Sequence, residues 1–181
     1  LAQNTVNGSG LNANDEHSTE LTHMWMSGSA TPHWIQYEFD GVYKLDTLWV
    51  WNSNQIIEAF VGFGAKNVTI EYSTDGAAWT VLEGVPEFAQ ANGLPTYKAN
   101  TVVDFGGVMA KFVRLTIDSN WGTAAPTSLS EVRFFYVPVQ AREPQPAAGA
   151  TGVALDAELN WRPGREAQSH KVYFGAEQAA V

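Results

Sequence analysis

The chain has 181 residues, no cysteine and a formal net charge of −9. The lack of cysteine excludes disulfides and thiolate zinc sites, and the acidic balance argues against nucleic acid and anionic membranes, which are bound by clustered Lys and Arg. Hydrophobic residues make up 45% of the sequence without any run of about 18 apolar residues, which indicates a packed core and no membrane span.

The first third of the chain predicts a polar loop followed by strands. Residues 1–33 are rich in Gly, Asn, Ser and Thr, so we expect irregular structure with at most one short strand. From Trp34 onward, apolar Ile35, Tyr37 and Phe39 alternate with polar residues, which predicts a half-buried strand. The Asp-Gly pair that follows marks a turn, and a second strand is expected at 42–51.

The middle of the chain continues the β pattern. Segment 56–66 is apolar and contains glycines, so it predicts a short helix or a loop. Alternation returns at 67–73, 111–118 and 131–137, and Asp75-Gly76 gives the signal of a hairpin. These short strands without a long amphipathic helix predict an all-β fold, either a sandwich or a jelly roll.

The last 44 residues differ in composition. Residues 138–150 contain three prolines and four alanines, which is typical of a linker. Residues 151–181 again suggest strands, but about 30 residues are too few to close a second sandwich core. We therefore expect a truncated second β module after the linker.

Five segments occur in the order found in the discoidin domain, also called the F5/8 type C domain. They are "LAQNTVNGSG", "MWMSG" with "WIQYEFD", "VTIEYSTDGAAWTVL", "AKFVRLTI" and "SLSEVRFF". Residues 1–137 thus resemble this family, including the carbohydrate-binding modules of family 32, and the tail "LNWRPGREAQSHKVYFG" is similar to the start of a fibronectin type III-like module. The resemblance implies a discoidin-like (galactose-binding-like) jelly-roll β-sandwich at 1–137, a linker at 138–150 and a partial fibronectin III-like β segment at 151–181.

The resemblance implies a non-catalytic carbohydrate-binding module that anchors a larger, secreted bacterial protein to glycans or polysaccharide, outside the cell or at its surface. The expected partners are carbohydrate and neighbouring domains of the same polypeptide, with neither nucleic acid nor membrane. A protein–protein or architectural adhesion module of a multidomain extracellular protein is the alternative. No enzyme is expected, because carboxylate pairs such as Asp15/Glu16 and Glu83/Glu87 lack a supporting nucleophile or base.

The family places its sugar on loops at one end of the sandwich. A pyranose stacks its apolar face on an aromatic ring, and its hydroxyls bind amide side chains. Two segments pair a tryptophan with amides: Trp51 with Asn52 and Asn54, and Trp121 with Asn120. Trp121 either contacts ligand or packs, packing is favoured for Trp51, and the two asparagines of the first segment could be simple strand-end turn residues.

Some expected site features depart from the family. Members that bind galactose or fucose often carry Asn-Arg where this chain has Asn52-Ser53, so galactose specificity is not implied. His17 and His33 are further candidate ligand-binding residues in the first loops, with solvated loop histidines as the alternative.

A structural calcium is common in the carbohydrate-binding branch of the family, and the resemblance implies a carboxylate ligand at Glu131. The family's loop motif is degenerate here, since Ser18 stands in the place of its Asp. Asp15, Ser18, Glu20 and Thr22 with backbone carbonyls could rebuild the site. In the alternative, Glu131 only accepts N–H bonds from the same loop.

Overall fold

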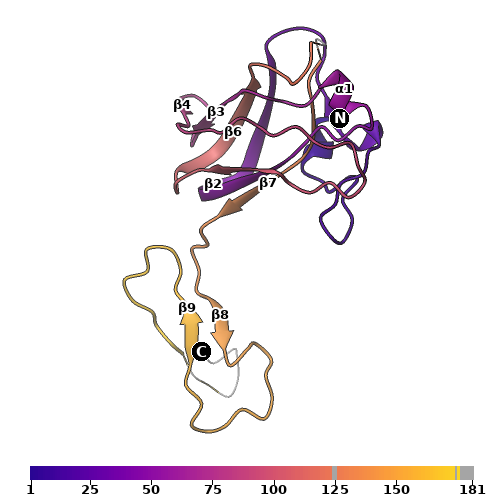
Figure 1. Cartoon of the computed structure of the whole chain (residues 1–181). Coiled ribbons are helices and arrows are strands. Elements are labelled where there is room, and N and C mark those ends of the chain that lie inside the picture. The colour runs from indigo at the N-terminus through magenta and orange to yellow at the C-terminus, as the bar shows by residue number, and fades with distance from the viewer. Residues whose placement is uncertain (124–125, 174, 176–181) are drawn as a thin grey trace. The chain divides into compact units, whose positions relative to one another are not determined.

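The computed structural model describes residues 1–123, 126–173 and 175, which form two units (Figure 1). The first unit covers Leu1–Tyr136 and the second begins at Val137. No helix in the described part of the chain is long and apolar enough to cross a membrane.

The first unit is organised around one long strand, β2 (His33–Asn52). The first part of β2 pairs with β6 (Met109–Ile117), and the second part pairs with β7 (Ser128–Tyr136) and β5 (Thr101–Asp104), always antiparallel. The sheet continues through β3 (Val68–Ser73) and β4 (Thr80–Val81) at one edge and β1 (Trp25–Met26) at the other. This curled antiparallel sheet is the predicted all-β jelly-roll sandwich.

The sequence predicts a turn at Asp40-Gly41, but the chain does not reverse there. Both residues lie inside β2. The register with β6 shifts between Glu38 and Tyr43, so the chain absorbs the extra residues as an irregularity and continues along the same partner. The Tyr43 hydroxyl donates to Asp40 Oδ1 at 2.7 Å, which closes the irregular segment. One bent strand can thereby line both halves of the sandwich.

The core lies between the two halves of the curled sheet and follows the predicted alternation. Ile35 and Tyr37 of β2 are buried, and so are their inward-facing partners on β6. Tyr37 also meets Phe134 of β7 edge to face, with ring centroids 5.2 Å apart. The buried aliphatic residues of the core are Ile35, Leu45, Leu48, Val50, Ala65, Val68, Ile70, Val103, Ala110, Val113, Leu115, Ile117, Leu129 and Val132.

The described residues contain three single-turn helices, two before the first strand and one between β2 and β3. Two are 3-10 helices near the N-terminus, η1 (Ala2–Thr5) and η2 (Leu21–His23). The third is α1 (Glu58–Val61), which lies in the segment predicted as a short helix or loop. It ends at Gly62, whose φ of 67° is a left-handed cap conformation favoured by glycine.

The second unit contains a two-stranded sheet of β8 (Arg142–Gln145) and β9 (Asn160–Arg162). Residues 142–145 therefore form a strand within the predicted linker, because β9 supplies a pairing edge that composition does not reveal. Most described residues of this unit are exposed, as expected for a sheet too small to bury a core. Residues 174 and 176–181 of the predicted partial module lie outside the described residues.

Candidate functional site

Three loops meet at the end of the first unit where β2 begins and ends (Figure 1). They are residues 27–32, 53–67 and the described part of 118–127 (118–123 and 126–127), and we call them the apical loops. Strand register brings them together, since His33 pairs with Ile117 while Asn52 pairs with Leu129. Backbone hydrogen bonds join all three, including Ser27 N–H to Thr127 O at 2.8 Å and Trp121 N–H to Gly64 O at 3.0 Å.

Asn52 joins two loops from inside the protein. Its side chain is fully buried, and Nδ2 donates to Ala65 O at 2.7 Å and to Ala89 O at 2.9 Å. Its Oδ1 accepts the N–H of Ser53 at 2.9 Å. The amide is therefore used for support, and it does not reach the surface where a ligand would bind.

Asn54 joins its own loop to two other segments, 17–18 and 93–94, in the same way. Its Nδ2 donates to the carbonyl oxygens of His17, Ser18 and Leu94 at 2.9, 3.2 and 2.9 Å. Its Oδ1 accepts the N–H of Gly93 at 3.0 Å, and the side chain is fully buried. The expectation that the amides of "NSN" face a sugar thus differs from their position, which is behind the apical loops.

Glu58 holds the loop that follows β2. Its carboxylate is buried beneath α1 and accepts the N–H of Gly64 at 2.8 Å. Oε2 has no hydrogen-bond partner within the described residues. Burial raises the pKa of Glu58, and the hydrogen bond from Gly64 opposes that rise.

Trp51 is a packing residue. It is only 1% exposed, and its Nε1 donates to Asp15 O at 3.0 Å. The guanidinium of Arg133 lies 5.1 Å from the ring centroid and also forms an ion pair with the Asp15 carboxylate at 2.8 Å. Trp51 thus fastens the first loop to the sandwich.

Trp121 is half-buried in its loop. Its Nε1 donates to Phe88 O at 2.9 Å, and the ammonium of Lys66 lies 4.5 Å from the ring centroid. Asn120 shapes the same loop, because its Oδ1 accepts the N–H of Gly122 and its Nδ2 donates to Pro126 O. Both residues contribute to loop structure, with Asn120 also at the edge of the hollow described next.

An open hollow of about 190 Å³ lies at the start of β2. The structure brings together here two of the residues predicted to bind ligand, His33 and Asn120. His33 is buried and not a solvated loop histidine, and its Nδ1 lies 3.0 Å from Ser27 Oγ. The structure also adds Asp118, an exposed carboxylate that accepts the Thr69 hydroxyl at 2.8 Å. The apical hollow is lined by Thr31, His33, Ile117, Asp118, Ser119, Asn120 and Thr127.

Sequence reasoning missed the contribution of Asp118, Thr31 and Thr127 to this hollow. Asp118 ends the alternating segment 111–118, so the signal was a carboxylate at the point where a strand gives way to a loop. Thr31 and Thr127 carry no such signal. They reach the hollow because the loop before β2 is bonded to the start of β7: Ser27 N–H donates to Thr127 O at 2.8 Å, and Thr127 N–H donates to Ser27 Oγ at 2.9 Å.

His17 lies elsewhere and is fully buried, in contrast to both the ligand-binding and the solvated interpretation. Its Nδ1 lies 2.8 Å from Ser18 O, and Nε2 has no partner within the described residues. Burial lowers the pKa of His17, so the imidazole is neutral at pH 7.

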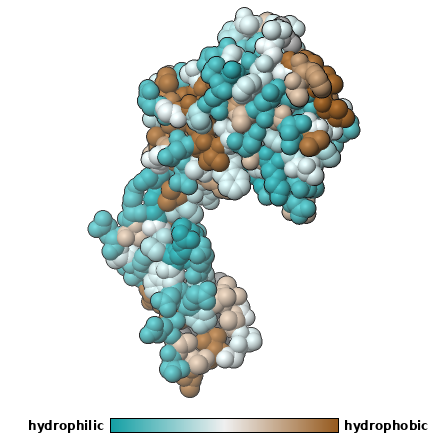
Figure 2. All heavy atoms as spheres, in the orientation of Figure 1, coloured by the Kyte–Doolittle hydropathy of each residue, from teal (hydrophilic) through white to brown (hydrophobic). Residues whose placement is uncertain are grey.

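An exposed apolar patch surrounds α1. Phe60 is 92% exposed, and Ile56, Ile57 and Leu94 are also exposed. Figure 2 shows brown, apolar surface on the side of the unit where α1 lies. The sequence predicts an apolar short helix or loop here but not the exposure of its side chains, because periodicity does not give the direction of a side chain on a one-turn helix.

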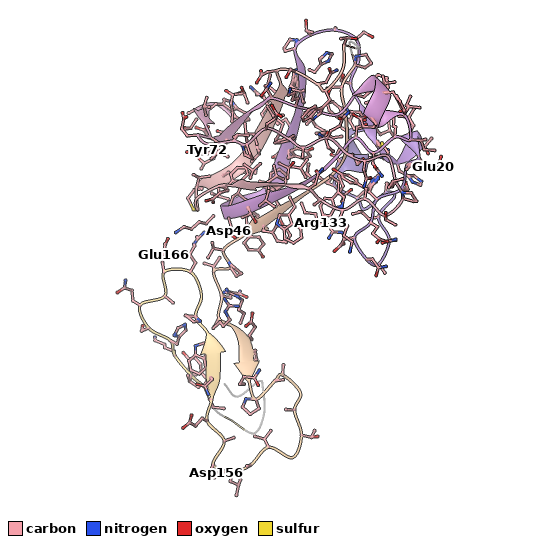
Figure 3. All side chains as sticks on the ribbon, in the orientation of Figure 1. Glu20, Asp46, Tyr72, Arg133, Asp156 and Glu166 are labelled. Carbon is pink, nitrogen blue, oxygen red and sulfur yellow. The ribbon has the colours of Figure 1, made fainter. Side chains whose placement is uncertain are left out.

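The five residues expected to hold calcium do not converge. Both carboxylate oxygens of Glu131 accept the N–H of Gly8, at 3.2 and 3.3 Å, while Asp15 pairs with Arg133. Ser18 Oγ lies 2.8 Å from His23 Nδ1. Two of the five, Glu20 and Thr22, are exposed, and Figure 3 shows Glu20 at the outer edge of the unit.

These contacts do not fit a calcium ion. Calcium needs six to eight oxygen ligands around one point, whereas Glu131 faces an N–H donor. Across the described residues, no three His, Asp or Glu side chains gather as a metal-binding group. The geometry corresponds to the alternative, in which Glu131 on β7 holds the first loop by accepting a backbone N–H, here that of Gly8.

Glu131→Gln is expected to stabilise the protein at neutral pH. Burial raises the pKa of Glu131 to about 7, so its folded-state pKa lies above the unfolded value and its contribution to stability is lost as the pH rises toward 7. The advantage of the variant should therefore grow between pH 4.5 and 7 and stay constant above. Urea unfolding at several pH values, with and without EDTA, measures this.

A calcium site would give the opposite pattern in that experiment. EDTA would lower the stability of the wild type, and Glu131→Gln would be less stable than the wild type when calcium is present.

The comparisons with known proteins place the chain in a family. Residues 2–132 match the family model of the F5/8 type C domain, so the chain belongs to that family. No curated protein matches the sequence.

Solved structures share the fold at low sequence identity. CBM32-3 from a family 31 glycoside hydrolase of Clostridium perfringens is 20% identical, with a TM-score of 0.53 over 75% of this chain and 82% of that one. A pectin-binding carbohydrate-binding module is 16% identical, with a TM-score of 0.51 over 74% and 78% of the two chains. A family 89 glycoside hydrolase of Clostridium perfringens is 15% identical with a TM-score of 0.48, and the match covers 74% of this chain but only 12% of that enzyme.

Proposed function

We propose that the chain is a non-catalytic carbohydrate-binding module whose ligand binds in the apical hollow. The observation that carries this proposal is the polar lining of the hollow by hydroxyl, imidazole, carboxylate and amide groups at the loop end of an F5/8 type C sandwich. Structures with the same fold include modules named as family 32 and as pectin-binding, which supports carbohydrate as the ligand class.

The chemistry of the hollow suits sugar hydroxyls. Asp118 can accept hydrogen bonds from hydroxyls, and threonine and serine hydroxyls can both donate and accept. The hollow is shallow and its residues are already fixed by the loops, so few groups are ordered on binding. A site of this size is expected to bind with a Kd of roughly micromolar to millimolar.

Catalysis does not match the lining of the hollow. Glycoside hydrolysis uses two carboxyl groups that flank the scissile bond, whereas Asp118 is the single carboxylate among the lining residues. We propose instead that the module holds other parts of a larger bacterial protein, outside the cell or at its surface, near the bound carbohydrate. The second unit from Val137, with its exposed strands, supports neighbouring domains of the same polypeptide as partners.

Asp118→Asn is expected to weaken carbohydrate binding about tenfold or more, because hydrogen bonds to a charged group contribute about 1.5–3 kcal/mol. The measurement is a glycan array to find a ligand, followed by calorimetry. Asp40→Asn is a matched control, since Asp40 is also exposed, also accepts one hydroxyl and lies roughly 20 Å away along β2. Equal binding by both variants would place the ligand outside the hollow, and no binding by the wild type would refute the proposal.

A further inference from the structure

Trp34 occupies an unusual position on β2. Its neighbours Ile35 and Tyr37 are buried, but Trp34 points to the outer face of the sheet and is 53% exposed. A strand position open to solvent normally carries a polar residue, as the next outward residue, Gln36, does. A large exposed aromatic side chain on a flat sheet face is a surface available for stacking.

The strands next to β2 add an oriented arginine beside this ring. Arg114 of β6 pairs in register with Gln36, and its Nε and Nη2 donate to Gln36 Oε1 at 3.2 and 3.0 Å. Its Nη1 lies 3.8 Å from a carboxylate oxygen of Glu71 on β3. The side chain is therefore held in one direction, and a guanidinium has five N–H donors, so donors remain for a ligand oxygen.

Two tryptophans flank this guanidinium. Its central carbon lies 4.1 Å from the ring centroid of Trp79 and 5.7 Å from that of Trp34. Trp79 covers one side of Arg114 and fixes it further, while Trp34 remains exposed. A hollow of about 340 Å³ lies here, lined by Pro32, Trp34, Arg114 and Thr116. We call this the face hollow.

The face hollow adjoins the apical hollow. Thr31 and His33 line the apical hollow, and the residues that follow each of them, Pro32 and Trp34, line the face hollow. On β6, Ile117 lines the apical hollow and the preceding residue, Thr116, lines the face hollow. Because successive side chains of a strand point to opposite faces, the two hollows open on opposite sides of the same strand end, and one extended ligand reaches both only by passing around that end.

We propose that the face hollow is a second sugar subsite, so that the ligand is a polysaccharide chain and not a single terminal sugar. This rests on the proposed function of the apical hollow. One pyranose binds in the apical hollow, and a further unit of the same chain stacks its apolar face on Trp34. Ring or hydroxyl oxygens of that unit accept hydrogen bonds from Arg114.

The chemistry of the face favours a sugar chain that is neutral at this position. Glu71 lies close to Arg114 and offsets part of its charge, and the chain as a whole carries a net charge of −9. A hydroxyl-bearing ring makes use of an aromatic plane with neighbouring N–H donors without burying an ion. The experiment below distinguishes this neutral sugar chain from an anionic chain of uronic acids.

The experiment compares ligand length. Affinity gel electrophoresis and calorimetry of the full chain are run with neutral β-galactan and polygalacturonate, and with oligosaccharides of one to six units from whichever binds. We expect affinity to rise at least tenfold between one and four units. Trp34→Ala should remove that rise, leave binding of the monosaccharide unchanged and change the thermal midpoint little.

The controls separate the subsite from general effects. Trp49→Ala removes another exposed tryptophan, one that lies where β2 pairs with β5 and β7, and it should keep the rise in affinity. Trp34→Phe should restore part of it, because a smaller ring still stacks.

Three outcomes would overturn the inference, and they differ from one another. If Trp34→Ala binds long chains as tightly as the wild type, the face subsite is wrong while the apical site stands. If only polygalacturonate binds and its affinity falls steeply with salt, the neutral class is wrong. If no saccharide binds the wild type, the proposed function and the inference both fail.

Discussion

Asn54→Ala is expected to lower the free energy of unfolding by about 3 kcal/mol or more. The amide of Asn54 satisfies the carbonyl oxygens of His17, Ser18 and Leu94 and the N–H of Gly93. Alanine would leave these groups unpaired inside the protein, and each unsatisfied buried group costs roughly 1–3 kcal/mol. Water entering the space would recover part of this, so the loss should lie near the lower end of the sum.

Urea unfolding of the wild type and the variant measures that loss. Asn92→Ala is the matched control, because Asn92 is an exposed asparagine whose amide caps only the N–H of Leu94 in its own turn. The control should lose about 0.5 kcal/mol. If the two variants were equally stable, Asn54 would not hold the segments at 17–18 and 93–94 against the end of β2.

Gly122→Ala is expected to disrupt the apical loops directly. A Cβ on Gly122 would lie 1.8 Å from Val61 O and 2.8 Å from Val61 C, both backbone atoms that cannot rotate away. Either α1 or the loop at 118–127 must move, and we expect a loss of about 3 kcal/mol together with weaker carbohydrate binding. The glycine is required here by close approach of two backbones.

Gly28→Ala provides the comparison for that variant. Gly28 lies in another apical loop, and a Cβ there would meet no atom within 4 Å. Its stability and binding should match the wild type, measured by thermal unfolding and calorimetry. A Gly122→Ala protein that keeps wild-type stability would show that α1 and the loop at 118–127 are not packed as described.

Much of the fold could be predicted because strands leave a local signal. Alternation assigned Ile35, Tyr37 and Leu115 to the core, and all three are buried. The continuity of β2 could not be predicted, because an Asp-Gly pair favours a turn unless a partner strand extends past it. β8 was missed for a similar reason, since β9 supplies its pairing from elsewhere in the sequence.

The candidate site was harder to predict than the fold. A tryptophan next to asparagines has the same composition whether it binds a ligand or supports a loop, and the difference depends on distant segments. Asn52 and Asn54 are buried because the residues at 89–94 return to cover them. The loop at 82–100 has no periodic pattern, so nothing in the sequence placed it over "NSN".

The most direct test of the account is a map of backbone amide chemical shifts during titration with a saccharide that binds. Binding in the apical hollow predicts that the largest changes fall at Thr31, His33, Thr127 and the segment 118–120. Asn52 and Asn54, which are buried behind the loops, should shift little. Changes centred on the exposed patch at Ile56 and Phe60, with the hollow unaffected, would contradict the account.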